Sequence, residues 1–511
     1  MRYIAAISYM GAGPDEEVIY FTTRPFTTRP TDTPAHRVME DRIINPALVR
    51  RDIFDVGTTG GSSRVGFGDL SLRNDDGALD WLSEVAVDGR DLVIYATEEE
   101  GAAFPADYRE LLRITMEQPE CTSSTLIIRL RDRQVIATRS LQDDLYGGTN
   151  ALPNGTDGIA SDLKNKPKPI LYGRVFNAEP AFVNTSRNIY QANDGAVRDV
   201  TAVYDSGALL SHGDDYASSA DMFSLIPAPG TFRVWKAGGM FRLGSTAFGQ
   251  VTFDGVEGQW PVDRTAGQIF VRLLTERAGL LTAQISATDI LAIDAVQDGV
   301  IGFYANQVLS VADALDQIAE TVGAWWATDS TGTFRLQRLE LPTGVPVLFL
   351  QTEDVQEGTL RKIPLNGNSL PAYQTTVRCV PNWTVQTTGL VERVGPARRA
   401  RLSSAYQDAT VTDAAVRARH RLSQERVVNT LFACRGTGEQ EAVRLQAIYG
   451  VKRDRFELTI HVTPQDLTVI DLGIVIQLTH PRYGLEEGRM FRVLGYQLDP
   501  VESTATLTIW G

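Results

Sequence analysis

The sequence predicts a mainly β, multidomain protein with one inserted α/β module, so its class is α+β overall. Short runs that alternate apolar and polar residues recur along most of the 511 residues. The 44 glycines and 23 prolines fall largely between these runs, as expected for turns. Only residues 263–345 combine apolar side chains at helical spacing with strand-like runs. We predict four domains, over residues 1–165, 166–262, 263–345 and 346–511.

The first predicted domain, residues 1–165, is β-rich. A strand-like "EVIYF" leads into the tandem "FTTRP-FTTRP", whose prolines prevent ladder pairing and indicate an extended edge or loop. We expect a short helix over "DTPAHRVMEDRI" and strands over "DLVIYAT", "STLIIRLRD" and "QVIATR". A Gly-, Asn-, Pro- and Lys-rich connector, residues 146–168, ends the domain. Whether this half of the chain is one domain or two stays open.

The acidic loop Asn74-Asp75-Asp76-Gly77 is interpreted as a turn. With Gly77 at the sixth position of a calcium loop, Leu72 and Ser83 would stand where the two anchoring ligands belong. Asp75 and Asp76 are adjacent, so in a strand they face opposite sides and in a turn they face water. We therefore expect Asp76 to cap a short helix over "ALDWLSEVAV".

The second predicted domain, residues 166–262, is also β-rich. Its strand-like runs are "PILYGRVFNAEPAFV", "NIYQA", "DVTAVYDSGALL" and "GTFRVWKAGGMFRLGSTAFGQVTFDG". The phrase "FGQVTF", which starts at Phe248, faintly repeats "FGDLSL", which starts at Phe67. This repeat leaves an internal duplication open.

The α/β module, residues 263–345, contains two expected helices and a hairpin. In "DRTAGQIFVRLLTERAGL" four apolar residues share one helix face, and Gly279 follows as the C-cap candidate. In "LSVADALDQIAETVG" we expect Ser310 as N-cap and Gly323 just beyond the end. The hairpin is "AWWATDSTGTFRLQRLEL", with its turn at residues 329–332. Alternation in this strand is expected to send one ring of Trp325 and Trp326 into the core.

The last predicted domain, residues 346–511, is expected to form an antiparallel sheet or a barrel-like domain with two helices. One helix is placed around residues 413–422. The other is placed over Gly438–Tyr449, with a capping box of Thr437 and Gln440 and with Gly450 at its end. "RFELTIHVT", "LGIVIQLTH", "MFRVLGYQLD" and "TATLTIWG" are expected strands.

The charge and cysteine content restrict the possible function classes. The formal net charge is −14, which argues against broad DNA binding, because phosphate neutralisation needs a basic surface. Cys121, Cys379 and Cys434 are scattered and include no CxxC, so they indicate a reducing compartment and neither a disulfide framework nor a zinc site. The N-terminal "MRYIAAISYMGAG" favours a strand over a signal peptide, and no apolar run is long enough for a membrane span. We expect a soluble chain made in the host cytoplasm.

No catalytic set is evident, so we expect no enzyme activity and assign no catalytic, cofactor-binding or metal-binding residue. The sequence lacks HExxH, GxSxG, P-loop and GxGxxG motifs. "DSGALLSHGDD", residues 205–215, places Asp, Ser and His close in sequence, but a working triad is assembled by the fold, not by local crowding. The five histidines follow no ligand spacing, and His461 is expected on the exposed side of its strand; they are His36, His212, His420, His461 and His480.

Several phrases, in this order, resemble one family over most of the chain. They are "FTTRPTDTPAHRVMEDRIINPALVRRDIF", "GDLSLRNDDGALDWLSEVAVDGRDLVIY", "DLKNKPKPILYGRVFNAEPAFV", "VTAVYDSGALL", "GFYANQVLSVADALDQIAETVGAWWATDSTGTFRL" and the closing "LGIVIQLTH…FRVLGYQLDPVESTATLTIWG". The chain resembles the tail-tip or baseplate hub proteins of long-tailed bacteriophages and of related gene transfer agents.

The resemblance implies a structural virion protein at the tail tip. Such hubs are homotrimers in which each chain carries two domains similar to the tail-tube protein, so that three chains form a pseudo-sixfold ring around a DNA channel. The implied partners are the tail tube or distal tail protein, the tape measure protein, and central fibre or receptor-binding proteins. No specific nucleic-acid binding or stable membrane insertion is implied. Some relatives bind an iron–sulfur cluster through four cysteines, and three scattered cysteines do not match that pattern.

Two alternatives remain. A receptor- or carbohydrate-binding tail-tip protein would use some of the seven tryptophans as sugar platforms. A tail-associated cell-wall hydrolase would need paired carboxylates or a Cys-His set. The sequence does not give the host, the receptor, the exact neighbours in the tail or the strands that form the ring.

Overall fold

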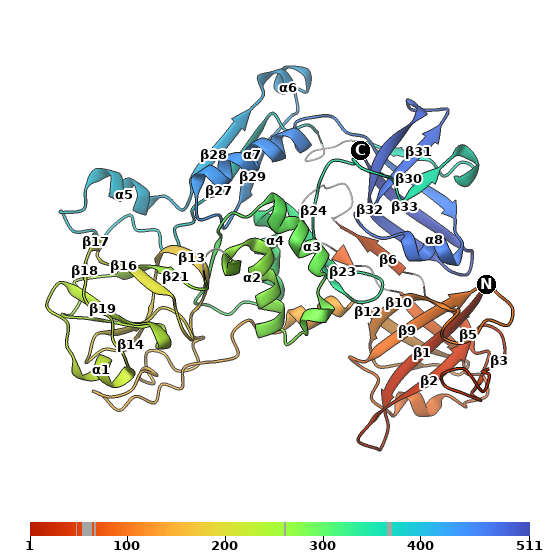
Figure 1. Cartoon of the computed structure of the whole chain (residues 1–511), viewed down its shortest axis with the longest axis horizontal. Helices are drawn as coiled ribbons and strands as arrows, with labels where there is room; N and C mark the ends of the chain where they lie inside the picture. Colours follow the sequence, from red (N-terminus) through yellow and green to blue (C-terminus); the bar gives the residue numbers. More distant parts are fainter. Residues whose placement is uncertain (48, 54–63, 66–67, 260–261, 365–369) are drawn as a thin grey trace.

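A computed structural model of the chain describes residues 1–47, 49–53, 64–65, 68–259, 262–364 and 370–511. Figure 1 shows two sheets side by side at one end of the molecule, a helical module in the middle and a smaller β unit at the other end. The fold is mainly β and multidomain, as predicted, and none of its described sheets closes into a barrel. The sequence predicted barrel-like domains, and the described sheets are open instead. The division into four domains stays a prediction.

The N-terminal sheet has eight strands in the order β2-β1-β9-β10-β12-β8-β5, with β11 paired to β12. Its strands are β1 (Arg2–Met10), β2 (Glu16–Thr22), β5 (Ile43–Asn45), β8 (Asp69–Arg73), β9 (Asp91–Thr97), β10 (Arg109–Met116), β11 (Glu120–Cys121) and β12 (Thr125–Arg131). The short pair β3 (Phe26–Thr27) and β4 (Val38–Met39) lies beside it. Strand β1 pairs antiparallel with β2 and β9 and is central and largely buried.

The C-terminal sheet also has eight strands, and it takes two of them from the N-terminal part of the chain. Its main path is β25-β31-β32-β33-β30-β26, while β6 pairs with β32 and with β7. The strands are β25 (Leu348–Leu350), β26 (Arg361–Ile363), β30 (Arg455–His461), β31 (Val475–His480), β32 (Leu485–Asp499), β33 (Thr504–Trp510), β6 (Val49–Asp52) and β7 (Arg64–Val65). The four long strands confirm the sequence prediction, and His461 is exposed as expected.

Residues 170–256 form most of two five-stranded sheets at the far end of the molecule. One sheet has the order β17-β16-β21-β13-β22 and the other β14-β15-β20-β19-β18. Their strands are β13 (Ile170–Ala178), β14 (Ala181–Asn184), β15 (Ile189–Gln191), β16 (Asp199–Asp205), β17 (Ala208–Leu209), β18 (Ser211–His212), β19 (Thr231–Trp235), β20 (Met240–Leu243), β21 (Val251–Val256) and β22 (Gly302–Ala305); α1 (Ser219–Ser224) and the 3₁₀ turn η3 (Lys236–Gly238) join them. Strands β13, β15, β16, β19, β20 and β21 confirm the predicted runs. Phe67, the start of the earlier repeat, lies outside the described residues.

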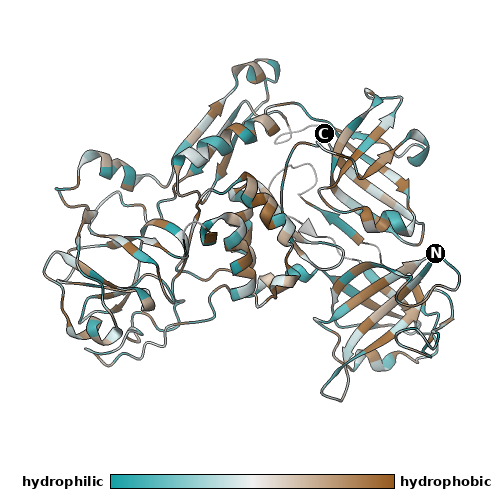
Figure 2. Ribbon diagram, viewed as in Figure 1, coloured by the Kyte–Doolittle hydropathy of each residue, from teal (hydrophilic) through white to brown (hydrophobic). Residues whose placement is uncertain are grey.

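The central module packs helices against the hairpin β23 (Ala324–Thr328) and β24 (Phe334–Arg338). Its helical elements are η4 (Val262–Arg264), α2 (Ala266–Arg272), the π-helical turn η5 (Leu273–Arg277), η6 (Thr282–Gln284), α3 (Ala287–Val296) and α4 (Val311–Thr321). The Ser310 hydroxyl caps α4 as predicted, and Gly279 and Gly323 adopt positive φ after the two helices. Figure 2 shows hydrophobic residues concentrated on these central helices.

A second small α/β unit, residues 374–449, joins the module to the C-terminal sheet. Strands β28 (Gln407–Thr412), β27 (Gln374–Cys379) and β29 (Glu425–Asn429) form a three-stranded sheet, and α7 (Arg435–Tyr449) packs on β27 and β28. Helices α5 (Pro396–Ser403) and α6 (Ala414–Arg419) lie in its connections, α8 (Pro464–Val469) lies in the C-terminal sheet region, and η7 (Thr352–Asp354) follows β25. Asp413 caps α6, inside the predicted 413–422 range.

Four local predictions outside the Asn74–Gly77 loop were wrong. Residues 32–43 form no helix: Pro34 lies in the turn, and β4 instead pairs with β3. "QVIATR" forms the 3₁₀ turn η2 (Arg133–Thr138), which the Asp132 side chain caps. Helix α7 begins at Arg435 after Cys434, so no capping box forms at Thr437 and Gln440. The earlier start places Gly438 inside α7, where an added Cβ would lie 2.8 Å from the Cys379 sulfur.

The fourth wrong prediction concerns the two adjacent tryptophans. Trp325 and Trp326 are both 4% exposed, because β23 lies between two hydrophobic cores. Trp325 packs in the core shared by the two large sheets, and Trp326 packs in the core of the central module. Alternation along the strand therefore holds, yet both faces are interior.

Candidate functional site

The loop at Asn74–Gly77 is a turn, as predicted, but Asp76 does not cap a helix there. The helix is reduced to the 3₁₀ turn η1 (Asp80–Ser83), whose N-cap residue Leu79 has no side-chain cap. The Asn74 Oδ1 accepts the Leu79 N–H at 2.8 Å, while Asp76 accepts the Ala78 N–H at 3.1 Å. Hydrogen bonds from backbone N–H groups to the side-chain oxygens of Asn74 and Asp76 stabilise the loop, which we assign neither as a catalytic nor as a metal-binding site.

Asp76 instead forms a two-point ion pair with Arg42. The Arg42 Nη1 and Nη2 donate to the two Asp76 oxygens at 2.9 and 2.8 Å. The bonds from Arg42 and from the Ala78 N–H hold the pKa of Asp76 well below its usual range. No sequence pattern predicts this contact, because Arg42 precedes the loop by 34 positions.

The "DSGALLSHGDD" segment does not form a nucleophile triad. The Ser206 hydroxyl donates to Asp205 at 3.0 Å, and Asp205 also accepts the N–H groups of Phe248 and Gly249. His212 bonds a different carboxylate, Asp215, at 3.2 Å. Asp205 is therefore a loop anchor, separated in function from His212.

Asp199, His212 and Asp215 place one ligand atom each within 4.8 Å of one another, and the group is largely exposed. The Lys236 ammonium already lies 2.7 Å from Asp215 and 3.3 Å from Asp199. These contacts, with that to Asp215 first, raise the pKa of Lys236, so it stays charged. A bound metal ion would have to displace this cation, and the arrangement is explained as a surface ion-pair cluster.

The three cysteines are free thiols that differ in environment, and Cys434 is near enough to Cys379 to interact with it electrostatically. Cys379 is buried, whereas Cys121 and Cys434 are exposed. Burial raises the pKa of the Cys379 thiol to about 11. A thiol with a raised pKa is a poor nucleophile and a poor metal ligand.

A recess of about 710 Å³ lies between β12, η2 and α4. Its charged lining groups pair with one another: Arg131 contacts Glu117, and the Trp326 indole N–H donates to Asp316 at 2.6 Å. Two other charged lining residues, Arg129 and Asp132, pair with Glu120 and Arg51, while the buried Nε2 of Gln134 has no hydrogen-bond partner among the described residues. We assign no ligand to this recess.

The joint between the two large sheets is the most highly organised polar site in the described part of the chain, and it is built around Arg51. Arg51 lies on β6 and is 3% exposed. Its Nη1 donates to Asp471 Oδ1 at 3.2 Å and to the Tyr496 hydroxyl at 3.1 Å, and its Nη2 lies 3.9 Å from Asp132. The three partners come from the segment before β31, from β32 and from the end of β12.

Electrostatics at this joint are those of a buried, paired charge. Burial lowers the pKa of Arg51, and Tyr496, Asp471 and Asp132 more than offset that effect, so Arg51 remains charged. Burial raises the pKa of Asp471, and it raises the pKa of Tyr496 to about 12. A network of this kind fixes geometry, because removing one partner leaves an uncompensated buried charge.

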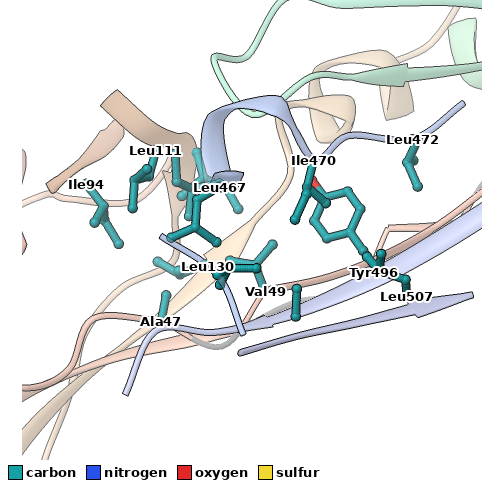
Figure 3. Close-up of a cluster of buried hydrophobic side chains, with 14 of the residues drawn as sticks. Ala47, Val49, Ile94, Leu111, Leu130, Leu467, Ile470, Leu472, Tyr496 and Leu507 are labelled. Atoms are coloured by element: carbon teal, nitrogen blue, oxygen red, sulfur yellow. The ribbon is translucent and has the colours of Figure 1, made fainter. Parts of the chain in front are cut away.

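Apolar packing surrounds the Arg51 network. Leu467 on α8 lies beside Ile94 and Leu111 of the N-terminal sheet, while Val49 on β6 lies near Tyr496 (Figure 3). A single hydrophobic cluster includes residues of both sheets, from Tyr3 to Trp510. The two sheets are thus one packed body.

A second buried network ties the central module to α7. Glu441 is 1% exposed and forms ion pairs with Arg338 on β24 and with Arg444, the latter at 2.6 Å. Arg444 also donates to the Leu339 carbonyl at 2.8 Å. Sequence reasoning missed both networks, since most of their members are far apart in the chain; only Glu441 and Arg444 have a regular spacing, i and i+3 on α7.

Comparisons with known proteins give structural neighbours but no sequence relatives. No family model and no curated protein matches the chain. Similar solved structures include a 43 kDa tail protein of prophage MuSo2 from Shewanella oneidensis, with a TM-score of 0.41, 10% identity and coverage of 99% of this chain and 98% of that one. A tail protein from Neisseria meningitidis MC58 has a TM-score of 0.40 and 8% identity, and covers 100% of this chain and 96% of that one.

A chain of a native gene transfer agent virion is also similar, with a TM-score of 0.42, 12% identity and coverage of 74% of this chain and 91% of that chain. The structural neighbours named here are thus two tail proteins and one chain of a gene transfer agent virion. At these TM-scores and identities, the likeness by itself assigns no function and no site to this chain. No described helix is long and apolar enough to cross a membrane.

Proposed function

We propose that this chain is a structural, non-enzymatic component of a phage-type tail: a homotrimeric hub that caps the tail tube. In this role it adapts the sixfold symmetry of the tube to a threefold central fibre or spike and leaves a channel for DNA. The observation that carries the proposal is the pairing of two eight-stranded sheets in one rigid body. This pairing fits the two tube-like domains per chain that the sequence resemblance implies.

The symmetry argument follows from the way the two sheets are joined. Strand β6 leaves the N-terminal sheet region and adds to β32, so main-chain bonds link the two halves. The buried Arg51 network and the shared core fix their relative position. Three such rigid pairs in a ring would present six sheets, which is the number a sixfold tube requires.

The charge of the chain is compatible with a DNA channel. A net charge of −14 repels phosphate, so a channel wall of this protein would let DNA pass without holding it. We expect the surface that lines the channel to be net negative. The proposed partners are a tail tube or distal tail protein, a tape measure protein and a central fibre or receptor-binding protein, and the proposed location is the virion tail tip.

Quantitative mass spectrometry of purified particles, together with the native mass of the recombinant chain, tests this function. The expected results are three copies per particle and a trimeric native mass. A chain that stays outside the particle, or a monomer that degrades isolated cell walls, would show that the proposal is wrong.

A further inference from the structure

A recess beside the start of α5 contains arginine nitrogens that have no acceptor. The recess has a volume of about 470 Å³ and is lined by Tyr204, Gly207, Ala208, Leu209, Arg393, Val394, Gly395 and Arg398. The guanidinium of Arg398 stacks 3.9 Å over the Tyr204 ring. Its Nε and Nη2 are buried and have no hydrogen-bond partner among the described residues. Buried donors of this kind are costly unless an acceptor satisfies them.

The surroundings leave these donors free for an external group. Residues 393–401 contain four arginines and no acidic residue. Arg399 and Arg401 are used locally, because they donate to backbone carbonyls such as those of Val391 and Val380. The Asp254 carboxylate interacts electrostatically with Arg398, but its described hydrogen bonds come from the Tyr204 hydroxyl and the Asn177 N–H. Arg393 is exposed at the rim.

The rim of the recess has the composition of a protein contact. Leu209 in the lining is 63% exposed, and Phe248, which is outside the lining in a loop anchored to Asp205, is 92% exposed. Arginine and aromatic side chains are enriched at protein interfaces, and a charged pocket with apolar neighbours suits a peptide segment better than a free ion. The occupant that fits is an acidic turn.

This chain carries such a turn at its opposite end. Residues Glu98–Glu100 are exposed, lie between β9 and β10, and form no ion pair within 4.0 Å that the structure describes. The other run of three acidic residues, Asp15–Glu17, is partly used, since Glu17 accepts the Tyr9 hydroxyl at 2.6 Å. Figure 1 places α5 and β9 at opposite ends of the molecule. A contact between opposite ends is heterologous, and such contacts form a ring where the rotation between successive copies closes.

We propose that the recess at the start of α5 receives the Glu98–Glu100 turn of a second copy of this chain, with carboxylates bonded to Arg393 and Arg398. This inference rests on the proposed trimer and names the surfaces that form it. Carboxylate–arginine bonds of this type are charge-assisted and geometrically selective. The contact would give acceptors to the two buried nitrogens of Arg398 and cation partners to the exposed carboxylates of Glu98–Glu100.

A charge-reversal set in the full-length chain tests the contact by sedimentation equilibrium. The recess variant is Arg393→Glu with Arg398→Glu, and the turn variant is Glu98→Lys, Glu99→Lys and Glu100→Lys. Each should lower the association constant by about tenfold or more. A chain that carries both sets should recover association, because the charges are again complementary. Moderate salt should weaken the wild-type contact.

The matched control reverses the other acidic run, Asp15–Glu17, and should leave association unchanged. Since Arg398→Glu can disturb the stacking on Tyr204, Arg393→Glu alone and the exposed turn variant provide measurements that do not depend on that site. A wild-type monomer, an unaffected turn variant, or failure of the combined chain to recover association overturns the inference. If the variants still form trimers and are present in three copies per particle, this contact is wrong but the proposed function is not contradicted.

Discussion

Replacing Arg51 by Met should destabilise the body formed by the two large sheets far more than any exposed arginine does. Arg51 is 3% exposed and lies 3.2 Å from Asp471 and 3.9 Å from Asp132. At an effective dielectric constant of about 20, these separations correspond to attractions of about 5 and about 4 kcal/mol. In the intact network, the free-energy cost of removing these charges from water cancels much of this attraction. Loss of Arg51 removes this cation from the buried Asp132 carboxylate and leaves Asp471 with Arg335, 3.8 Å away, as its remaining cation. Removing one partner from a buried ion pair typically costs about 3–5 kcal/mol.

Urea unfolding followed by tryptophan fluorescence measures the effect, because Trp325 and Trp510 lie in the same core. The matched control is Arg50→Met on the same strand, where the side chain is half exposed and pairs with Asp52 at 2.9 Å. Exposed pairs contribute about 1 kcal/mol or less, so the control should be nearly neutral. Equal effects of the two substitutions would refute the claim that Arg51 holds the sheets together.

The pH dependence of the Arg51→Met variant gives a second signature. Burial already raises the pKa of Asp471 in the folded chain, and loss of Arg51 should raise it further. A carboxyl whose folded pKa is raised stabilises the fold below its unfolded pKa of about 4 and loses that contribution as pH rises through the folded value. The defect of the variant should therefore be smallest near pH 4 and grow toward pH 8. A pH-independent defect would contradict this assignment.

Three further changes test other parts of the structure. The Arg42 contact lowers the pKa of Asp76, so it stabilises the fold above the unfolded pKa of about 4, and this stabilisation is lost as pH falls through the folded pKa. The difference in thermal midpoint between the wild type and Asp76→Asn should therefore shrink on acidification. Gly173→Ala should lower the free energy of unfolding, measured in urea, by roughly 1–3 kcal/mol or more. The reason is that φ is +73° and an added Cβ would lie 2.0 Å from the Ile301 carbonyl oxygen. A neutral effect would contradict the close contact between β13 and β22. Thiol titration of the native chain should find two reactive cysteines and a third, Cys379, that reacts only after unfolding; three fast thiols would contradict its burial.

Local patterns in the sequence predicted many of the elements. The alternation of "RFELTIHVT" predicted β30, and Ser310 with Gly323 predicted the limits of α4, because periodicity and caps act within a few residues. The failures also have local causes. Pro34 and the pairing of β4 with β3 prevent the helix expected over residues 32–43. The capping box expected at Thr437 and Gln440 does not form, because α7 already begins at Arg435.

The candidate site was not predictable in the same way. Arg51 and Tyr496 are 445 positions apart, and no spacing rule connects a strand arginine to a tyrosine at that distance. The sequence similarly gave no sign that β6 leaves its own region to pair with β32. Strand pairing across a chain depends on which edges meet in the folded protein, and a single sequence does not encode this in any local pattern.

The position of β6 also has a consequence for synthesis. A ribosome that adds 5–20 residues per second needs roughly 20–90 s to make the chain between Arg51 and Tyr496. Throughout that interval Arg51 and the apolar Val49 have no partner sheet, and an unpaired strand edge is prone to aggregate. During synthesis, the N-terminal half of the chain therefore leaves the ribosome before β32, the strand that pairs with β6, has been made. The joint between the two sheets cannot form until β32 has been synthesised, so no shorter nascent chain contains it.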